Sequence, residues 1–182
     1  MNRALHTALP SLLVLGALVA CGTADPHPAP ATQTSTVATT TTAGPAEPPP
    51  VPGPTTDGQC PYLASSVVQE ANGQLVRKVR LSADQPNPAC FFYANASDIQ
   101  LSVWVFQGDA KTAKAVVDRA APVADSNPAT EPAGWNGGSS TTDTGAVYAI
   151  AKDGTAVVVT SNQKQTIKTR RVAETVVVNL GL

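Results

Sequence analysis

The chain has 182 residues, 42% of them hydrophobic, and its twelve Lys and Arg against thirteen Asp and Glu give a net charge of −1. A charge this close to balance offers no case for nucleic-acid binding or for strong electrostatic attachment to lipid. Both histidines, His6 and His27, precede the segment predicted below to fold, so histidine-activated nucleophiles, histidine general acid–base chemistry and histidine zinc sites are excluded there.

The first residues form the pattern of a bacterial lipoprotein signal. Arg3 precedes an apolar run at residues 8–20, which is shorter than the ~20 residues that a membrane-spanning helix needs. The run ends in Leu18-Val19-Ala20-Cys21, the pattern that lipoprotein signal peptidase cuts directly before the cysteine. We therefore predict a signal peptide at residues 1–20 and acylation of Cys21, with palmitate among the chains. An ordinary secretory peptide or a short membrane anchor is the alternative.

Acyl chains on Cys21 would hold the mature protein on the outer face of the cytoplasmic membrane, since each buried CH₂ contributes about 0.8 kcal/mol. Residues 21–59 then change composition, with nine prolines and no aromatic, Lys or Arg residue between positions 22 and 58. So little apolar surface cannot offset chain entropy, and we predict a disordered tether. Its threonine cluster could also accept O-linked sugar, although a solubilising spacer explains it more simply.

Residues 60–182 are long enough for one globular domain with its own core. The expected elements, in chain order, are a helix that begins at Pro61 and stops at Asn72-Gly73, strands at Leu75–Leu81, Ala89–Ala94 and Ile99–Gln107, a helix that Asp109 caps and Pro122 ends, strands at Ala146–Ala151 and Thr155–Ser161 joined by a hairpin at Lys152-Asp153-Gly154, and a helix at Thr166–Leu180. The order α-βββ-α-ββ-α predicts an α+β fold with a mainly antiparallel, five-stranded sheet packed with helices.

Cys60 and Cys90 are the two thiols that remain once Cys21 is acylated. Outside the membrane an isolated pair in a small domain favours a disulfide, which would join the first helix to the second strand. A separation of 30 residues corresponds to about 3.5 kcal/mol in the chain-entropy model. A metal site is disfavoured because two thiolates would lack further ligands.

Two aromatic features are candidate ligand contacts. Trp135 lies in a long loop, residues 124–144, between glycines that would let its indole move; its alternative is to fold back and pack against the sheet. Trp104 and Phe106 share the strand face opposite the aliphatic side chains, and their alternative is burial under a helix.

Four cations gather near the start of the last predicted helix, where the helix dipole disfavours positive charge unless an anion is present. They are Lys164, Lys168, Arg170 and Arg171, and we treat them as candidate contacts to an anionic headgroup or wall polymer. A solvated helix face is the simpler alternative.

Several segments of the folded part form a combined pattern: Cys60-Pro61-Tyr62-Leu63, Pro88-Ala89-Cys90-Phe91, the run from Val117 to Pro122, the run from Glu131 to Gly138, and Ala156 to Val159 followed by Asn162-Gln163. Together they resemble an uncharacterised family of actinobacterial exported lipoproteins. The resemblance implies an actinobacterial envelope, and it carries over no activity and no catalytic residues.

We therefore expect a non-enzymatic binding or interaction domain, without catalytic residues, metal or cofactor, whose partner is an envelope protein, a lipid or a wall component. One alternative is a carrier of lipid or another hydrophobic ligand, which needs an enclosed apolar cavity. The other is a carboxylate-dependent envelope hydrolase, which needs two carboxylates that converge in a cleft.

Overall fold

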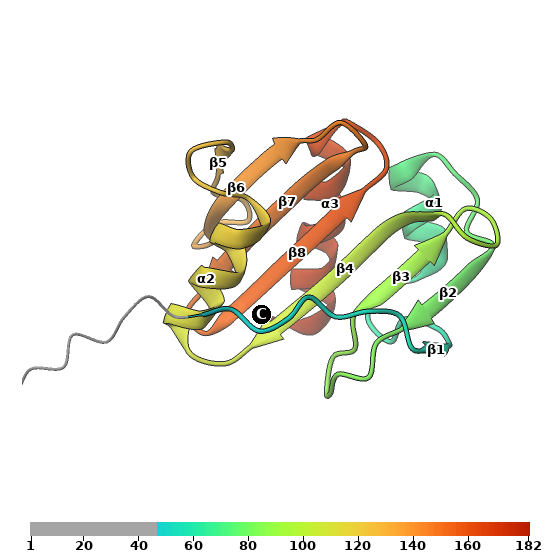
Figure 1. Ribbon diagram of the computed structural model, residues 1–182, viewed down its shortest axis with the longest axis horizontal. Helices are drawn as coiled ribbons and strands as arrows, with labels where there is room; N and C mark the ends of the chain where they lie inside the picture. The colour runs from blue at the N-terminus through green and yellow to red at the C-terminus, as the bar shows by residue number, and fades with distance from the viewer. Residues whose placement is uncertain (1–46) are drawn as a thin grey trace, which may run out of the picture. The chain divides into compact units, whose positions relative to one another are not determined.

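The computed structural model describes residues 47–182 (Figure 1). The predicted signal peptide, Cys21 and most of the predicted tether lie outside these residues. The described elements are β1 (Thr56–Asp57), α1 (Ser65–Asn72), β2 (Lys78–Leu81), β3 (Cys90–Tyr93), β4 (Ile99–Gln107), α2 (Ala110–Ala120), β5 (Asn127–Ala129), β6 (Asn136–Thr141), β7 (Ala146–Lys152), β8 (Thr155–Ser161) and α3 (Thr166–Leu180).

The strands form one antiparallel sheet of eight strands in the order β1-β2-β3-β4-β8-β7-β6-β5. The prediction of a five-stranded sheet is therefore wrong. The α+β arrangement of helices on an antiparallel sheet is as expected, but β1, β5 and β6 were not predicted. β8 pairs along its whole length with β4 on one side and with β7 on the other, so the longest strands lie at the centre.

The missed strands are made of residues that strands normally avoid. β5 contains Pro128, which a sheet tolerates at its edge, and β6 contains Gly137 and Gly138. A Cβ atom at Gly137 would lie 1.9 Å from the carbonyl oxygen of Ala149 in β7, so the close approach of the two strands requires glycine there. β1 is two residues long and falls inside the predicted tether.

Most of the other elements are confirmed. β4 and α3 have the predicted bounds, the β7–β8 hairpin turns at Asp153, and Asp109 caps α2. The carboxylate of Asp109 accepts hydrogen bonds from the hydroxyl and the backbone N–H of Thr112 at 2.7 and 2.9 Å, and the pKa of Asp109 is lowered mainly by that hydroxyl.

The first helix begins later than predicted, at Ser65 instead of Pro61. Tyr62 and Leu63 are buried, and the Tyr62 hydroxyl donates to the carbonyl of Pro88 at 2.8 Å. Burial also raises the pKa of Tyr62. These contacts hold residues 61–64 against the core in a non-helical path.

The two faces of the sheet are covered differently. Helices α1 and α3 pack on one face, over the larger core of aliphatic and aromatic side chains contributed by β3, β4, β7 and β8. On the other face α2 covers β6, β7 and β8, and a smaller cluster of Ala and Val side chains fills the space between them. In Figure 1, α2 lies in front of the sheet and α3 behind it.

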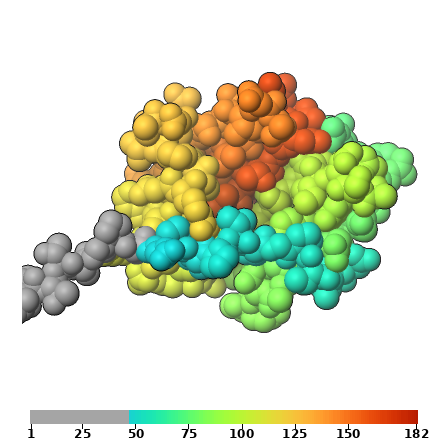
Figure 2. Space-filling model, in the orientation of Figure 1, coloured from blue at the N-terminus to red at the C-terminus, as the bar shows by residue number. Residues whose placement is uncertain are grey.

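Beside α2, the same face is crossed by an extended segment, residues 47–57, that we call the strap. Figure 2 shows it running over the domain surface from α2 towards β1. The Arg119 guanidinium donates to the carbonyls of Pro48 and Pro49 at 3.4 and 2.6 Å, and Arg80 donates to the carbonyl of Thr55 at 2.9 Å. The last part of the predicted tether is therefore attached to the domain through its backbone carbonyls, and does not act as a free spacer.

The predicted disulfide is confirmed. Cys60 and Cys90 are bonded, with their Cα atoms 5.7 Å apart. Because α1 begins at Ser65, the bond joins the segment just after the strap to β3, and not the first helix to the sheet as predicted.

Candidate functional site

Two hollows with mainly apolar linings open on the α2 face of the sheet, one on each side of the helix. We call the first the α2–β6 groove, with a volume of about 400 Å³. The second, the strap groove, has a volume of about 200 Å³. Each is built by a different set of elements and has different chemistry.

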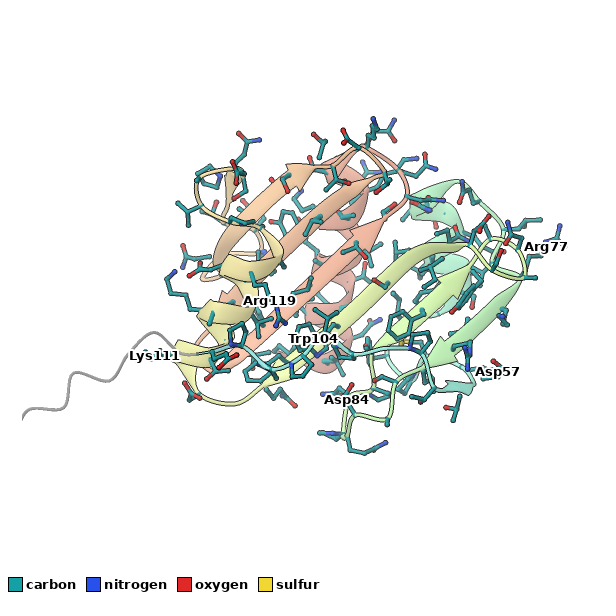
Figure 3. All side chains as sticks on the ribbon, viewed as in Figure 1. Asp57, Arg77, Asp84, Trp104, Lys111 and Arg119 are labelled. Atoms are coloured by element: carbon teal, nitrogen blue, oxygen red, sulfur yellow. A yellow bond between two sulfur atoms is a disulfide. The ribbon has the colours of Figure 1, made fainter. Side chains whose placement is uncertain are left out.

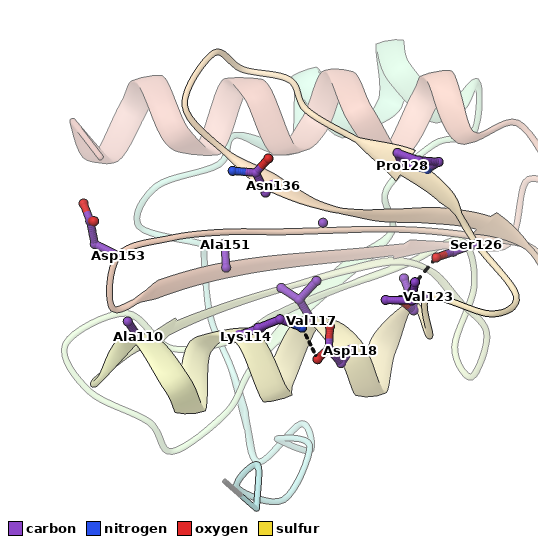
Figure 4. Close-up of a pocket in the computed structure, with 12 residues that line it drawn as sticks. Ala110, Lys114, Val117, Asp118, Val123, Ser126, Pro128, Asn136, Ala151 and Asp153 are labelled. Carbon is purple, nitrogen blue, oxygen red and sulfur yellow. Dashed lines mark hydrogen bonds and ion pairs between the residues drawn. The ribbon is translucent and has the colours of Figure 1, made fainter. Parts of the chain in front are cut away.

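The α2–β6 groove lies between α2 and the end of the sheet formed by β5, β6 and β7 (Figure 4). Its apolar lining comes from Val117, Val123, Pro128 and small side chains such as Ala151. Charged and polar side chains stand around it: Lys114, Asp118, Asn136 and Asp153. The groove thus has an apolar floor and a polar rim that carries both signs of charge.

Small residues lie where the end of α2 meets the sheet beside this groove. A Cβ atom at Gly138 would lie 3.0 Å from the Cβ of Ala121, so glycine in β6 allows the end of α2 to approach the sheet closely. Pro122 follows directly, and α2 ends at Ala120. The chain then turns outward and leaves Val123 78% exposed at the lip of the groove.

Asp118 and Asp153 are the two carboxylates at this groove, and they do not form a catalytic pair. Asp118 is in an ion pair with Lys114 one helical turn away. Asp153 lies in the β7–β8 turn, and Figure 4 shows it at the far end of the groove from Asp118. Within residues 47–182, no group of three or more His, Cys, Asp or Glu side chains is placed to hold a metal ion. The α2–β6 groove therefore offers an apolar surface and charged side chains at its rim.

The strap groove has an aromatic floor. Phe91 and Trp104 line it from β3 and β4, and Val158 lines it from β8. The Arg119 guanidinium lies 5.6 Å from the centre of the Trp104 ring, and the two side chains are adjacent in Figure 3. A cation held over an indole in this way is stabilised by the ring quadrupole.

The structure separates the predicted aromatic contacts. Trp104 is half-buried and lines the strap groove, while Phe106 is half-buried against the cluster under α2, edge-on to Trp104 with ring centres 6.3 Å apart. Trp135 is 2% exposed and belongs to the larger core on the α3 side of the sheet. Trp135 therefore packs against the sheet, which was the alternative to a ligand contact, and a side chain this buried does not reach a ligand in solvent.

The four predicted anion contacts do not converge. Lys168 donates to the carbonyl of Asn72 at the end of α1, 3.3 Å away, which satisfies a helix C-terminus. Arg170 pairs with Glu174 at 3.4 Å, and Arg171 lines a different hollow beside Val178. Lys164 is exposed before α3 begins. The simpler alternative, a solvated set of cations, describes this arrangement better than a single anion site.

Sequence reasoning missed Arg119, Val123 and the strap. Arg119 is a basic residue in the last turn of α2, where it would ordinarily be assigned to the helix dipole. The available signal was the run of prolines directly before the domain together with an aromatic pair on one strand face, because extended proline-rich chains pack on aromatic side chains.

Within residues 47–182 no helix is both long and apolar enough to cross a membrane. Residues 43–182 match a family described as a domain of unknown function (DUF2020). This match includes the strap as well as the folded elements that follow it. No curated protein sequence matches the chain.

Proposed function

The chain belongs to this DUF2020 family, for which no function is described, and we propose a function from its own residues. We propose that residues 60–182 form a non-enzymatic interaction domain of an envelope lipoprotein. In this proposal acylated Cys21 anchors the protein on the outer face of the cytoplasmic membrane of an actinobacterium. The domain then binds an amphipathic segment of an envelope protein in the α2–β6 groove.

The observation that carries the proposal is the composition of this groove. An apolar floor, one strongly exposed aliphatic side chain at the lip, Val123, and a rim with both signs of charge resemble the core and rim of a protein interface. A volume of about 400 Å³ accommodates one or two large side chains of a partner.

A lipid carrier is supported less well. Carriers enclose most of the ligand surface, and the space between the sheet and α1 and α3 is occupied by the larger core, including Phe92, Leu101 and Trp135. The hydrolase alternative is supported least, because Asp118 is paired with Lys114 and lies apart from Asp153.

Photo-crosslinking from the lip of the groove tests the proposal. Val123 and Val178 are equally exposed, at 78% and 76%, but Val178 lies on α3 on the opposite face. Each would be replaced in the full-length, membrane-bound protein by benzoylphenylalanine, and adducts would be identified by mass spectrometry after irradiation of intact cells. We expect one protein adduct from position 123 that is absent from position 178.

A second substitution identifies the groove as the source of this contact. Ala110 is exposed and lines the α2–β6 groove at the end opposite Val123 (Figure 4), so Ala110→Trp should obstruct the path of a bound segment without disturbing the core, and Ala110→Ser should leave it open. The adduct at position 123 should disappear with Trp and persist with Ser. Equal adducts from positions 123 and 178, or an adduct that survives Ala110→Trp, would contradict the proposal. A lipid adduct alone would favour the carrier.

A further inference from the structure

We propose that the strap groove is a recognition site for proline-rich polypeptide in the polyproline II conformation. The strap occupies this site in the isolated chain, and a proline-rich segment of another envelope protein takes its place in the bound state. This inference concerns a different groove from that of the proposed function, and only the envelope origin of the partner rests on that proposal.

The groove has the chemistry that such a ligand requires. A polyproline chain has few N–H donors, and its carbonyls point to solvent with no internal hydrogen bonds. It is therefore recognised by apolar ring packing and by donors that reach its carbonyls. Trp104 and Phe91 supply the rings, and Arg119 supplies the donor to two successive carbonyls, those of Pro48 and Pro49.

The strap itself shows which sequence fits. From Glu47 to Pro54 it reads Glu-Pro-Pro-Pro-Val-Pro-Gly-Pro, in which five of eight residues are proline. Val51 and Pro52 lie against the groove beside Trp104 and Phe91. The Arg119 guanidinium that bonds to the strap also lies over the Trp104 ring, so the donor and the aromatic floor form one site.

The strap is held in a way that allows exchange. None of its residues from position 47 to 57 is buried, and Val51 is 67% exposed. Its strand β1 is only two residues long. Its other polar attachments are at exposed positions: the hydrogen bonds from Arg119 and Arg80, the hydrogen bonds of the Thr55 hydroxyl and N–H to the carbonyl of Leu81, and the ion pair of Asp57 with Arg80. Segments with little buried apolar surface open at low free energy. A hollow of about 200 Å³ also remains beside Val51 and Pro52, so the strap does not fill the groove.

The test uses the mature chain from Gly22 onward, labelled with ¹⁵N, and a capped synthetic peptide with the sequence of residues 44–54. The chain has two tryptophans, so two indole N–H signals report on binding. Trp104 lines the groove, and Trp135 lies in the core on the other side of the sheet and serves as an internal control. A peptide with alanine in place of every proline is the control ligand.

Three variants distinguish the effect of the strap from the effect of the groove that it occupies. A loosened-strap variant carries Pro48→Gly, Pro49→Ser, Val51→Ser and Pro52→Gly, and none of these four positions is itself buried. Arg119→Gln removes the donor at an exposed site, and Arg119→Lys keeps the charge but not the planar fork. The strap competes with the peptide for the groove within the same molecule. We therefore expect the peptide to bind the loosened-strap chain at least about ten-fold more tightly than the unaltered chain.

The expected result is a shift of the Trp104 signal alone, in both the unaltered and the loosened-strap chains, that is absent with the alanine peptide and with Arg119→Gln. Arg119→Lys should weaken binding. Three results would overturn the proposal: no shift in a folded loosened-strap chain, a shift that Arg119→Gln leaves intact, or binding to the loosened-strap chain with none to the unaltered chain at millimolar peptide. If the loosened-strap chain does not fold, the proposal is tested by comparing the Trp104 and Trp135 indole signals of the unaltered chain and of Arg119→Gln on addition of the peptide. A dimer of the unaltered chain that the peptide dissociates would assign the groove to a second copy instead.

Discussion

Cys60, just after the strap, is bonded to Cys90 at the start of β3, with the two Cα atoms 5.7 Å apart. Cys90 is fully buried, so the bond attaches the strap end of the chain directly to the core. We expect the native protein to be lighter than the reduced protein by the mass of two hydrogen atoms. Reduction should lower the free energy of unfolding by about 3.5 kcal/mol for a separation of 30 residues.

The control for this prediction is the chain with Cys60→Ser and Cys90→Ser. Its urea unfolding midpoint should match that of the reduced protein and should not change on addition of reductant. Thiols in the native protein that react with alkylating agents before unfolding would contradict the prediction.

Trp135 is a core residue, and its truncation should show this. It is 2% exposed and packs in the cluster that includes residues of α3. Trp135→Ala should therefore lower the free energy of unfolding by about 3 to 5 kcal/mol. The measurement is urea unfolding of the purified protein. Crosslinking from position 123 should be retained under conditions where the variant is folded, and an unchanged unfolding midpoint would contradict the core position.

Periodicity predicted the elements whose two faces meet different environments. In β4, Leu101, Val103 and Val105 face the larger core and Trp104 faces α2 and the strap, so the alternation of side chains is visible in the sequence. In β6 the pattern is missing because Gly137 and Gly138 have no side chains to alternate. Glycine is needed at these two positions because β7 and α2 approach them closely, and no local sequence pattern encodes that tertiary contact.

The candidate site was harder to predict because it joins distant parts of the chain. Arg119 and Pro49 are 70 residues apart in sequence, and their hydrogen bond exists because the strap crosses the sheet back to the end of α2. Proline-rich composition predicted a disordered tether there, whereas residues 47–57 lie across the sheet in an extended path with none of them buried. It could not predict attachment, since attachment depends on distant residues of the folded domain. Arg119 and Arg80 bond to the strap, and two aromatic rings line the groove beside it.

A buried amide joins α1 to the sheet, and its loss should be costly. The Asn72 side chain is 1% exposed; its amide nitrogen donates to Gln100 and its oxygen accepts from the Ser161 hydroxyl at 2.6 Å. Asn72→Ala should lower the free energy of unfolding by about 2 to 3 kcal/mol, because it leaves two buried polar partners unsatisfied. Ser161→Ala, which removes one partner, should have a smaller effect. Both are measured by urea unfolding, and equal effects would contradict a role of Asn72 as the partner of both Gln100 and Ser161.

Gly137 should be required for the pairing of β6 with β7. A methyl group there would meet the carbonyl oxygen of Ala149 at 1.9 Å, whereas a methyl group at Gly53 in the strap would meet nothing within 4 Å. We expect Gly137→Ala to lower the thermal midpoint by several degrees and to increase amide hydrogen exchange in β5 and β6. Gly53→Ala is the matched control and should change neither quantity. An unaffected exchange pattern in β6 would show that the two strands can separate slightly to accept the methyl group.

The predicted lipid anchor is tested by Cys21→Ser, which removes the only thiol of the Leu18-Val19-Ala20-Cys21 pattern. Without the thiol no thioether to diacylglycerol can form, so the protein should move to soluble fractions or accumulate as unprocessed precursor, and it should lose incorporation of labelled fatty acid. The chain with Cys60→Ser and Cys90→Ser is the control, because those cysteines are bonded to each other and should not be acylated. It should keep both the label and the membrane location. A Cys21→Ser protein that is still processed and still sediments with membranes would contradict lipid anchoring and favour an ordinary secretory peptide with another means of attachment.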